Sequence, residues 1–148
     1  GIKFSGDIAK ALAAGADAIM MGSIFAGTDE SPGKKFKIKG KLYKQFRGMG
    51  SIGAMSSGSA NRYFQKNFKD KSKFVPEGVE GRVEYKGIVS KIIYQLQGGL
   101  RSSMGYIGAK DINQIQKKAK FIKITKAGFY ESMVHSVEIT QKTTNYKL

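Results

Sequence analysis

The 148-residue chain contains no cysteine and a single histidine, His135. Without cysteine the sequence has no disulfide, no thiolate metal site and no cysteine nucleophile. One histidine without a second histidine or cysteine does not make a metal site, and we expect a structural role for His135. Covalent catalysis through a thiol would need residues that this sequence does not contain.

Long apolar runs are also absent. No stretch approaches the roughly 20 residues that a membrane-spanning helix needs. The sequence starts with Gly1-Ile2-Lys3-Phe4, without an initiator methionine and without the pattern of a signal peptide. We expect a single domain at this length, no membrane partner, and a cytoplasmic protein of which this sequence is a piece.

Arginine is scarce although the chain is strongly basic. The net charge is +15, yet only four of the 26 basic residues are arginines. Proteins that read nucleic acids rely on arginine forks and aromatic platforms. The scattered lysines therefore predict a solvated surface and no nucleic-acid partner. A basic module that binds nucleic acid or another partner is the rival interpretation from a different functional class. The arginines all lie beside glycine-rich or loop-like stretches: Arg47, Arg62, Arg82 and Arg101.

The first thirty residues have the pattern of a helix followed by a strand. Residues 7–14 are expected to form a helix that Ser5 caps and Gly15 ends. Residues 16–21 are apolar and compact, which is typical of a short buried strand. A helix and a strand joined by a very short connection are the repeating unit of parallel α/β folds.

Lysine alternates with apolar residues in residues 34–39 and again in residues 41–44. Lys39-Gly40 favours a tight turn between them, so we expect an exposed hairpin with its six lysines largely on the solvent face. Residues 48–81 are rich in Gly, Ser and Lys and have little regular period. A stretch of this length without secondary structure is usually a functional loop or lid.

Three glycines at the start of this lid form a GxGxxG pattern: Gly48, Gly50 and Gly53. The dinucleotide-binding fingerprint needs a buried apolar strand before the glycines and a helix after them. Here residues 39–46 are lysine-rich, and residues 56–60 consist of serine, glycine and alanine. The glycines instead predict a loop that brings bare backbone close to a ligand.

The last third of the sequence predicts helices and few strands. Apolar residues at helical spacing predict a helix over residues 88–97, with Ile88, Ile92 and Leu96 in the core, which can continue to residue 104. Further elements are expected as a helix over residues 111–118, a strand over residues 121–124 and an extended tail over residues 140–148. These are too few strands for a closed parallel sheet, so we expect the chain to be stable only as part of a larger body.

Two groups of residues have the chemistry of an anion site and of a proton-transfer site. Gly22 and Ser23 place backbone N–H groups and a hydroxyl after a predicted strand, which suits a phosphate, and Gly1 could belong to the preceding loop. Arg62 beside Tyr63 can orient a water molecule and help to take its proton. Spacing alone is equally compatible with a plain tight turn at Gly22. For Arg62 and Tyr63, a surface arginine beside a partly buried tyrosine is the plainer interpretation.

Two acidic residues in the second half are further candidates. Glu77 lies between proline and glycine, so its carboxylate is held on a rigid turn and could accept hydrogen bonds from a ring N–H. A solvated turn carboxylate is the plainer interpretation. Glu131 and Ser132 could offer carbonyl oxygens to a monovalent cation, although spacing alone does not show this.

Taken together, these motifs resemble the C-terminal third of the inosine-5′-monophosphate (IMP) dehydrogenase family. The resemblance covers essentially the whole chain. The order and the number of the matching motifs make the resemblance specific. The matching stretches are residues 1–10, 21–23, 47–55, 62–65, 75–82, 98–105 and 145–146.

The resemblance implies an α/β fold, the C-terminal part of a TIM (β/α)8 barrel with an inserted hairpin and a mobile flap. Residues 1–28 would be the end of the barrel with its last strand and phosphate loop. Residues 29–85 would be the hairpin and catalytic flap, and residues 86–148 the last barrel helix and the C-terminal segment. All three would belong to one catalytic domain whose N-terminal part is missing.

The same resemblance implies an oxidoreductase of guanine nucleotide biosynthesis, normally a homotetramer. It would oxidise IMP to XMP with NAD, using a catalytic cysteine and a monovalent cation, usually K+. The flap would close after hydride transfer and activate water to hydrolyse a thioester. The residues implied are Gly1, Gly22 and Ser23 at the IMP phosphate, Met49, Gly50 and Glu77 at the hypoxanthine, Arg62 and Tyr63 on the flap, Tyr106 near the adenosine of NAD, and Glu131 and Ser132 at a neighbouring subunit's cation site.

The sequence departs from the family pattern at three positions and in one larger respect. Phe46 stands where a tyrosine usually contacts the phosphate, which should weaken one contact. Met133 and Ser136 replace a histidine and an aspartate of many bacterial members, which puts the cation site or the tetramer contact in doubt. The catalytic cysteine, the ribose-binding aspartate and the regulatory CBS domains are not in this sequence, so we expect no activity from the chain alone.

GMP reductase is the closest rival within the same barrel type. It shares the phosphate loops, but it is expected to lack the long flap with the Arg62-Tyr63-Phe64-Gln65 motif. That motif therefore favours IMP dehydrogenase. The sequence does not reveal whether the missing upstream part exists in the native protein.

Overall fold

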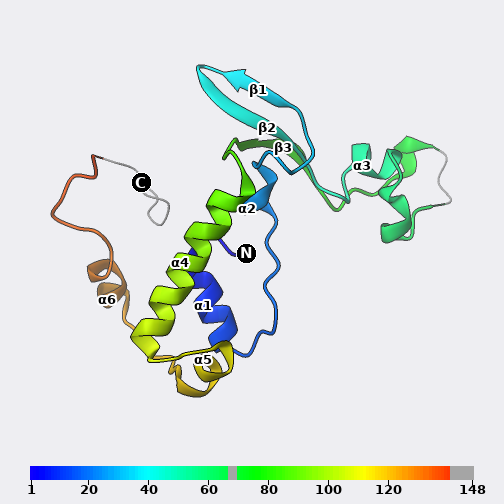
Figure 1. Ribbon diagram of the computed structural model, residues 1–148. Coiled ribbons are helices and arrows are strands. Elements are labelled where there is room, and N and C mark those ends of the chain that lie inside the picture. The colour runs from blue at the N-terminus through cyan, green and yellow to red at the C-terminus, as the bar shows by residue number, and fades with distance from the viewer. Residues whose placement is uncertain (67–69, 141–148) are drawn as a thin grey trace. The chain divides into compact units, whose positions relative to one another are not determined.

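Figure 1 shows the computed structural model, which describes residues 1–66 and 70–140. The chain divides into two compact units. Unit 1 consists of Gly1–Met20 and Ile93–Leu148, and unit 2 consists of Met21–Ile92. Residues 141–148, with the predicted extended tail and the matching residues Asn145 and Tyr146, lie outside the described part of the chain.

Unit 1 begins with helix α1 (Ser5–Ala13), close to the predicted range. Its N-cap is Phe4, not Ser5 as expected. The Asp7 carboxylate accepts hydrogen bonds from the backbone N–H groups of Lys3 (2.9 Å) and Phe4 (3.0 Å), so a side chain inside the first turn satisfies donors just before the helix. These two bonds hold the pKa of Asp7 below its ordinary value. Gly15 follows the helix with a φ of +101°, as expected of a helix-ending glycine.

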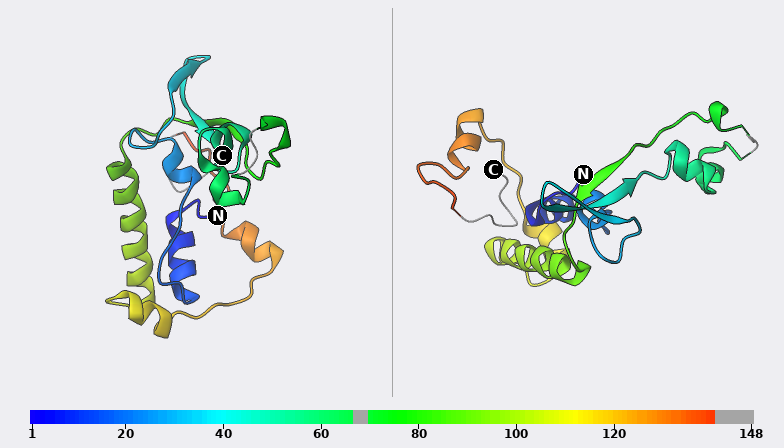
Figure 2. Two further views of the ribbon diagram at one scale, coloured as in Figure 1. Left: turned by 90° about the vertical axis from the view of Figure 1, so that its right-hand side faces the viewer. Right: turned by 90° about the horizontal axis from the view of Figure 1, so that it is seen from above.

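The long helix of the chain is α4 (Val89–Ile107), which continues through Gly98 and Gly99 as predicted. A Cβ on Gly99 would collide with the Ser5 side chain, so glycine allows α1 and α4 to approach closely. Figure 2 shows the two helices side by side. Of the predicted apolar stripe, Leu96 is buried but Ile88 is 43% exposed. The expectation of a fully buried stripe was wrong at Ile88, which lies just before α4 and belongs to unit 2.

Helix α5 (Ile112–Lys118) packs against α1 and completes the core of unit 1. Its N-cap is Asp111, at the start of the predicted range, and the Asp111 carboxylate accepts a 2.8 Å hydrogen bond from the Gln114 backbone N–H. Ile115 is fully buried. The core of unit 1 consists of Ile8, Ala9, Leu12, Leu96, Ala109 and Ile115.

Two predicted strands are wrong. Residues 16–21 run as coil, with the Met20 side chain 95% exposed, and residues 121–124 are also coil, with Ile122 80% exposed. A strand needs a hydrogen-bonded neighbour, and the described residues provide none for either segment. The next element, helix α6 (Lys126–Glu131), was not anticipated. Thr125 caps it by accepting a 3.0 Å hydrogen bond from the Gly128 N–H.

Unit 2 is built on a three-stranded antiparallel sheet of order β1-β2-β3. Strands β1 (Lys35–Ile38) and β2 (Lys41–Arg47) form the predicted hairpin. The φ angles of Lys39 (+45°) and Gly40 (+80°) are both positive, as a two-residue type I′ turn requires. Strand β3 (Glu80–Glu84) was not predicted, because Glu-Gly-Arg-Val-Glu lacks an apolar alternation.

The segment that joins β2 to β3 is not structureless, as had been expected. It contains helix α3 (Ile52–Ser56) and two 3₁₀ helices, η1 (Ser59–Tyr63) and η2 (Lys71–Lys73). Thus a helix does open within the GxGxxG pattern, at Ile52, contrary to the argument from sequence. The preceding strand β2 is nevertheless antiparallel and largely exposed, so the pattern is not a dinucleotide fingerprint. Unit 2 also contains the short helix α2 (Ser23–Ala26).

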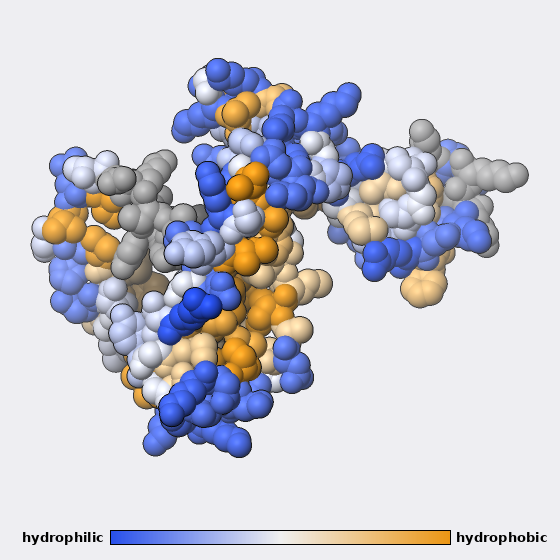
Figure 3. All heavy atoms as spheres, in the orientation of Figure 1, coloured by the Kyte–Doolittle hydropathy of each residue, from blue (hydrophilic) through white to orange (hydrophobic). Residues whose placement is uncertain are grey.

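Apolar side chains remain exposed in unit 1. Figure 3 shows orange surface over α4 and over the segment that contains α6. Every residue from 120 to 138 is exposed. No helix in the described residues combines the length and apolarity needed to cross a membrane.

Candidate functional site

Two loops meet at the end of β2 through backbone hydrogen bonds. The Gly48 N–H donates to the Val79 carbonyl (2.8 Å), and the N–H groups of Glu77 and Gly78 both donate to the Gly50 carbonyl (3.0 Å each). A Cβ on Gly78 would lie 2.9 Å from the Ser51 nitrogen, so the approach requires glycine. The structure thus brings together Met49, Gly50 and Glu77, three residues predicted to lie at one site.

The predicted pair Arg62 and Tyr63 lies against the same loop. A Cβ on Gly50 would be 2.9 Å from Cζ of the Tyr63 ring, which therefore packs on the bare backbone. Nη1 of Arg62 lies 3.7 Å from Sδ of Met49. The Ser59 hydroxyl, from the first residue of η1, donates a 2.5 Å hydrogen bond to the Met49 carbonyl. All five predicted residues of the lid and the two loops thus form one cluster, which we call the flap junction: Met49, Gly50, Arg62, Tyr63 and Glu77.

Helix α3 is held to the sheet at its N-terminus. Ser51 caps it through a 3.3 Å hydrogen bond from the Ala54 N–H. The Glu80 carboxylate of β3 accepts a 2.8 Å hydrogen bond from the Gly53 N–H. A carboxylate at a helix N-terminus is favoured by the partial positive charge there. These contacts fix the start of the segment between β2 and β3, which we call the flap segment, relative to the two strands.

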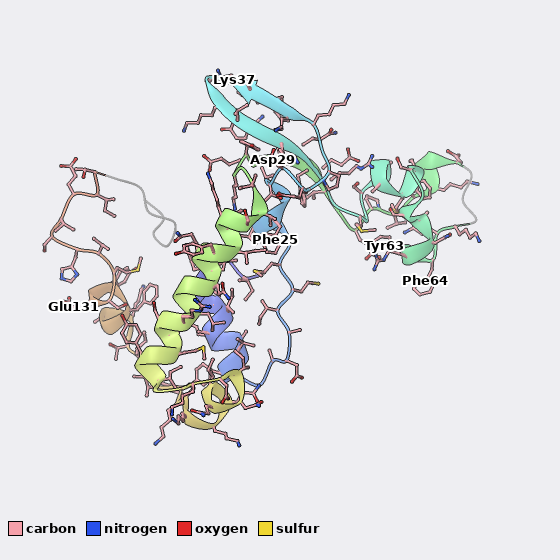
Figure 4. All side chains as sticks on the ribbon, in the orientation of Figure 1. Phe25, Asp29, Lys37, Tyr63, Phe64 and Glu131 are labelled. Carbon is pink, nitrogen blue, oxygen red and sulfur yellow. The ribbon has the colours of Figure 1, made fainter. Side chains whose placement is uncertain are left out.

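Gln65 ties the far part of the flap segment to the Glu77 turn. Its side-chain nitrogen donates to the Val75 carbonyl (3.0 Å), and its side-chain oxygen accepts from the Val75 N–H (2.9 Å). Only 9% of Gln65 is exposed. The neighbouring Phe64 has a φ of +56° and is 99% exposed, and Figure 4 shows its ring pointing away from the segment. Sequence reasoning gave Gln65 no role of its own, because a glutamine in a polar loop has no periodicity to mark it.

The predicted phosphate residues Gly22 and Ser23 begin α2. Gly22 is its N-cap, and both residues are exposed. The last residue of α2, Ala26, lines a cavity of 480 Å³ that Phe46, Met49 and Ser59 also line. Helix α2, through Ala26, and the flap junction, through Met49, therefore border one cavity within unit 2. Gly1 belongs to unit 1.

A surface cluster secures the chain just after α2. The Asp29 carboxylate accepts hydrogen bonds from Nζ of Lys35 (2.7 Å) and from the Tyr85 hydroxyl (2.7 Å). The bond from Lys35, followed by that from Tyr85, holds the pKa of Asp29 below its ordinary value, and the charge of Lys44 adds to the lowering. The expectation that the hairpin lysines lie largely in solvent is right except at Lys44, which is only 2% exposed.

The remaining predicted residues lie in unit 1. Tyr106, on α4, is 92% exposed. Glu131 ends α6, and its carboxylate lies 3.4 Å from Nε2 of His135. Ser132 is the C-cap of α6, and its hydroxyl donates a hydrogen bond to the Phe129 carbonyl (2.7 Å). Within residues 1–66 and 70–140, no three His, Cys, Asp or Glu side chains form a group that could hold a metal ion.

Comparison with known proteins relates the whole chain to two enzymes. The sequence profile of the "IMP dehydrogenase / GMP reductase domain" matches residues 1–135. Inosine-5′-monophosphate dehydrogenases from Chlorobaculum parvum and Aquifex aeolicus are each 57% identical over 99% of this chain. The enzyme from Streptococcus pyogenes is 53% identical over 100% of it. The chain spans only 30%, 29% and 30% of these relatives.

A solved structure also matches. It is a C318A variant of GMP reductase from Trypanosoma brucei in complex with guanosine 5′-monophosphate, with a TM-score of 0.77 and 46% identity, covering 93% of this chain and 27% of that one. The preference for IMP dehydrogenase that was based on the Arg62-Tyr63-Phe64-Gln65 motif stays a prediction, since this match concerns the chain as a whole and not that motif. From the profile match and these identities, the chain belongs to the IMP dehydrogenase / GMP reductase family.

Proposed function

We propose that this chain is the C-terminal portion of the catalytic TIM barrel of an IMP dehydrogenase, which oxidises IMP to XMP with NAD. The observation that carries the proposal is the flap junction, where Arg62 and Tyr63 pack on the Met49-Gly50 loop beside Glu77. The relatives named IMP dehydrogenase are 53–57% identical to the chain, against 46% for the GMP reductase.

The cavity of unit 2 would receive the nucleotide. At its α2 end, the backbone N–H groups of Gly22 and Ser23 would bind the 5′-phosphate, because the first N–H groups of a helix have no partner within the helix. At the other end, Met49 and Gly50 would contact the hypoxanthine, and the Glu77 carboxylate would accept its ring N–H. Phe46 lines the cavity and has no hydroxyl, so the phosphate lacks one contact that a tyrosine would supply.

Arg62 and Tyr63 would activate water in the second half of the reaction. The guanidinium group already lies beside the Met49 side chain, and the Tyr63 ring lies on Gly50. A cation and a phenol at this position can orient a water molecule next to the purine and assist the removal of its proton. We therefore propose that both residues act in hydrolysis and not in hydride transfer, because their chemistry suits the activation of water.

NAD and K+ would contact unit 1. The 92% exposed ring of Tyr106 is available to stack on the adenosine of NAD, which accepts the hydride when it is bound. The Glu131 and Ser132 carbonyls at the end of α6 are hard oxygen donors at the negative end of a helix, which fits a monovalent cation. The tetramer and a cytoplasmic location are parts of the same proposal, as are the three regions 1–28, 29–85 and 86–148.

A chimera tests the proposal. The chain replaces the matching segment of the Chlorobaculum parvum IMP dehydrogenase, so that the partner sequence supplies the thiol that this chain lacks. We expect IMP-dependent reduction of NAD with XMP as the product, and no activity from the chain alone. The unmodified Chlorobaculum enzyme is the control.

The second candidate is GMP reductase, which the Trypanosoma brucei structure favours. It is tested in the same chimera by supplying GMP with a reduced nicotinamide cofactor. Conversion of GMP to IMP without oxidation of IMP would replace the first proposal with the second. A folded chimera that turns over neither nucleotide would contradict both.

A further inference from the structure

One lysine of the hairpin differs from the other five. Lys44 is 2% exposed, whereas Lys34, Lys35, Lys37, Lys39 and Lys41 are all exposed. A buried ammonium group is costly unless it is well paired. Lys44 therefore requires hydrogen-bond partners that compensate for its burial.

The partners of Lys44 are backbone carbonyls of the segment that follows α2. Its Nζ donates a 2.6 Å hydrogen bond to the Thr28 carbonyl and a second, short hydrogen bond to the Ser31 carbonyl. Among the described residues, Lys44 forms no salt bridge with a carboxylate. Charge-assisted hydrogen bonds of this kind are stronger than those between neutral groups. Lys44 therefore fixes the path of the main chain from residue 28 to residue 31.

This link joins the two walls of the cavity. One wall comes from Ala26 and residues 31–33, and the other comes from residues 45–47 and Met49. Lys44 belongs to the strand of the second wall and bonds to the segment of the first. The walls also touch at Gly33, where a Cβ would collide with the Gln45 carbonyl, so their spacing is tightly set.

The first wall is continuous with the proposed phosphate site. Thr28 is 1% exposed, and both its N–H (3.0 Å) and its hydroxyl (2.8 Å) donate to the Phe25 carbonyl in α2. The backbone of Gly27 accepts from the Lys86 N–H (2.9 Å). A path of direct contacts therefore runs from Lys44 through Thr28 to the helix whose N-cap is Gly22.

We propose that Lys44 is a positioning residue of the nucleotide site, which holds α2 with Gly22 and Ser23 at the correct distance from the wall that contains Phe46 and Met49. Its ammonium group acts through the Thr28 and Ser31 carbonyls and does not touch the nucleotide. The inference rests on the proposed function, since it takes α2 as the phosphate-binding helix. It adds a residue to which sequence reasoning gave no role beyond that of a solvent-facing lysine.

The test uses the chimera with Chlorobaculum parvum enzyme and three variants. Lys44→Met keeps the length of the side chain and removes its charge and its donors. Lys44→Arg keeps a cation that can donate to both carbonyls. Lys41→Met is the matched control, because it removes the same charge from an exposed position of the same strand. The Kd for IMP is measured by isothermal titration calorimetry, and the KM for NAD by turnover.

The expected result is selective for the nucleotide. Lys44→Met weakens IMP binding by about tenfold or more, since small displacements of a binding group have large effects. Its KM for NAD stays within about twofold of the parent. Lys44→Arg binds IMP more tightly than Lys44→Met, and Lys41→Met matches the parent chimera.

Several results would overturn the inference. The first is an unchanged Kd for IMP in Lys44→Met, and the second is an equal weakening of IMP binding and of the KM for NAD. The third is a Lys41→Met variant that weakens IMP binding as much as Lys44→Met does. The fourth is a Lys44→Met protein that does not fold, which would assign the lysine to folding alone. A parent chimera that binds IMP without oxidising it would contradict the proposed function and leave the Lys44 comparison valid. A folded parent chimera that binds no IMP would overturn both.

Discussion

Unit 2 and the C-terminal part of unit 1 differ in how far their residues find bonding and packing partners within the unit. In unit 2, three antiparallel strands and two loops meet through hydrogen bonds within the unit. In unit 1, α1, α4 and α5 share a small core, but every residue from 120 to 138 is exposed, including Phe121, Ile122 and Phe129. The three antiparallel strands find their partners within unit 2, whereas apolar residues such as Ile122 leave most of their side chain exposed. The difference indicates that the sheet of unit 2 is completed within the unit, whereas residues 120–138 bury none of their side chains against the described residues.

The largest expected effect sharpens the contrast within unit 1. Ile115→Ala removes a fully buried side chain from the α1–α5 core and should lower the free energy of unfolding by about 2–5 kcal/mol. Ile122→Ala is the same substitution at a side chain that is 80% exposed, and it should change stability by less than about 0.5 kcal/mol. Urea denaturation of the chain, followed by circular dichroism, measures both. Similar losses in the two variants would show that residues 121–124 are buried in solution.

The next prediction tests the flap junction in unit 2. A Cβ at Gly78 would lie 2.9–3.1 Å from backbone atoms of Gly50 and Ser51, which cannot move aside as a flexible side chain could. Gly78→Ala should therefore lower IMP turnover in the chimera by about a hundredfold. Gly81→Ala is the control, because nothing lies within 4 Å of its added carbon. Equal IMP turnover in the two variants would show that the close approach at Gly78 is not needed for catalysis.

Much of the hairpin and of the helices could be predicted from the sequence, because their signals are local. Lys39-Gly40 specifies the turn, and Asp111 specifies the start of α5. Strand β3 was missed because its pairing with β2 depends on residues some forty positions away, not on its own alternation. The strands expected at residues 16–21 and 121–124 were wrong in this chain because a parallel strand depends on neighbours from elsewhere.

For the candidate site, too, the sequence predicted some residues and missed others. Met49, Gly50, Arg62, Tyr63 and Glu77 were singled out from motifs, and the structure places them together, although their roles remain predictions. Gln65 was named only as a member of a motif, and Lys44 only as one of the hairpin lysines; neither was given a role of its own. Their importance lies in hydrogen bonds to distant backbone groups, which leave no pattern in the sequence.

A smaller effect is expected at the Gln65 contact. Gln65→Ala removes two hydrogen bonds to Val75 and leaves a part-buried N–H and carbonyl without those partners, which should cost about 1–3 kcal/mol locally. The Val75 amide should then exchange with solvent about ten to a hundred times faster, as hydrogen-exchange NMR would detect. Gln97→Ala, on the exposed face of α4, should leave that rate unchanged. An unaffected Val75 rate in Gln65→Ala would show that the contact does not hold the flap.

The smallest effect concerns pH. The pKa of Asp29 is lowered mainly by Lys35, so the Asp29 contacts stabilise the hairpin at pH values above the ordinary carboxyl pKa of about 3.9 and are lost as the pH falls through the lowered pKa. Lys35→Ala should raise the pKa of Asp29 toward its ordinary value, as an NMR titration of the Asp29 carboxyl carbon would show. Lys37→Ala removes an exposed lysine from the same strand and should not change it. An identical pKa in Lys35→Ala and the parent would contradict the assigned cause.

The most direct measurement of the central claim is the time course of NADH formation by Arg62→Ala in the chimera. If Arg62 activates water on the flap, the first turnover should produce NADH as a burst at the parent rate, and the following turnovers should be slower by about 10²–10⁴-fold. Equal slowing of the burst and of the later turnovers would contradict the assignment of Arg62 to the hydrolytic half of the reaction.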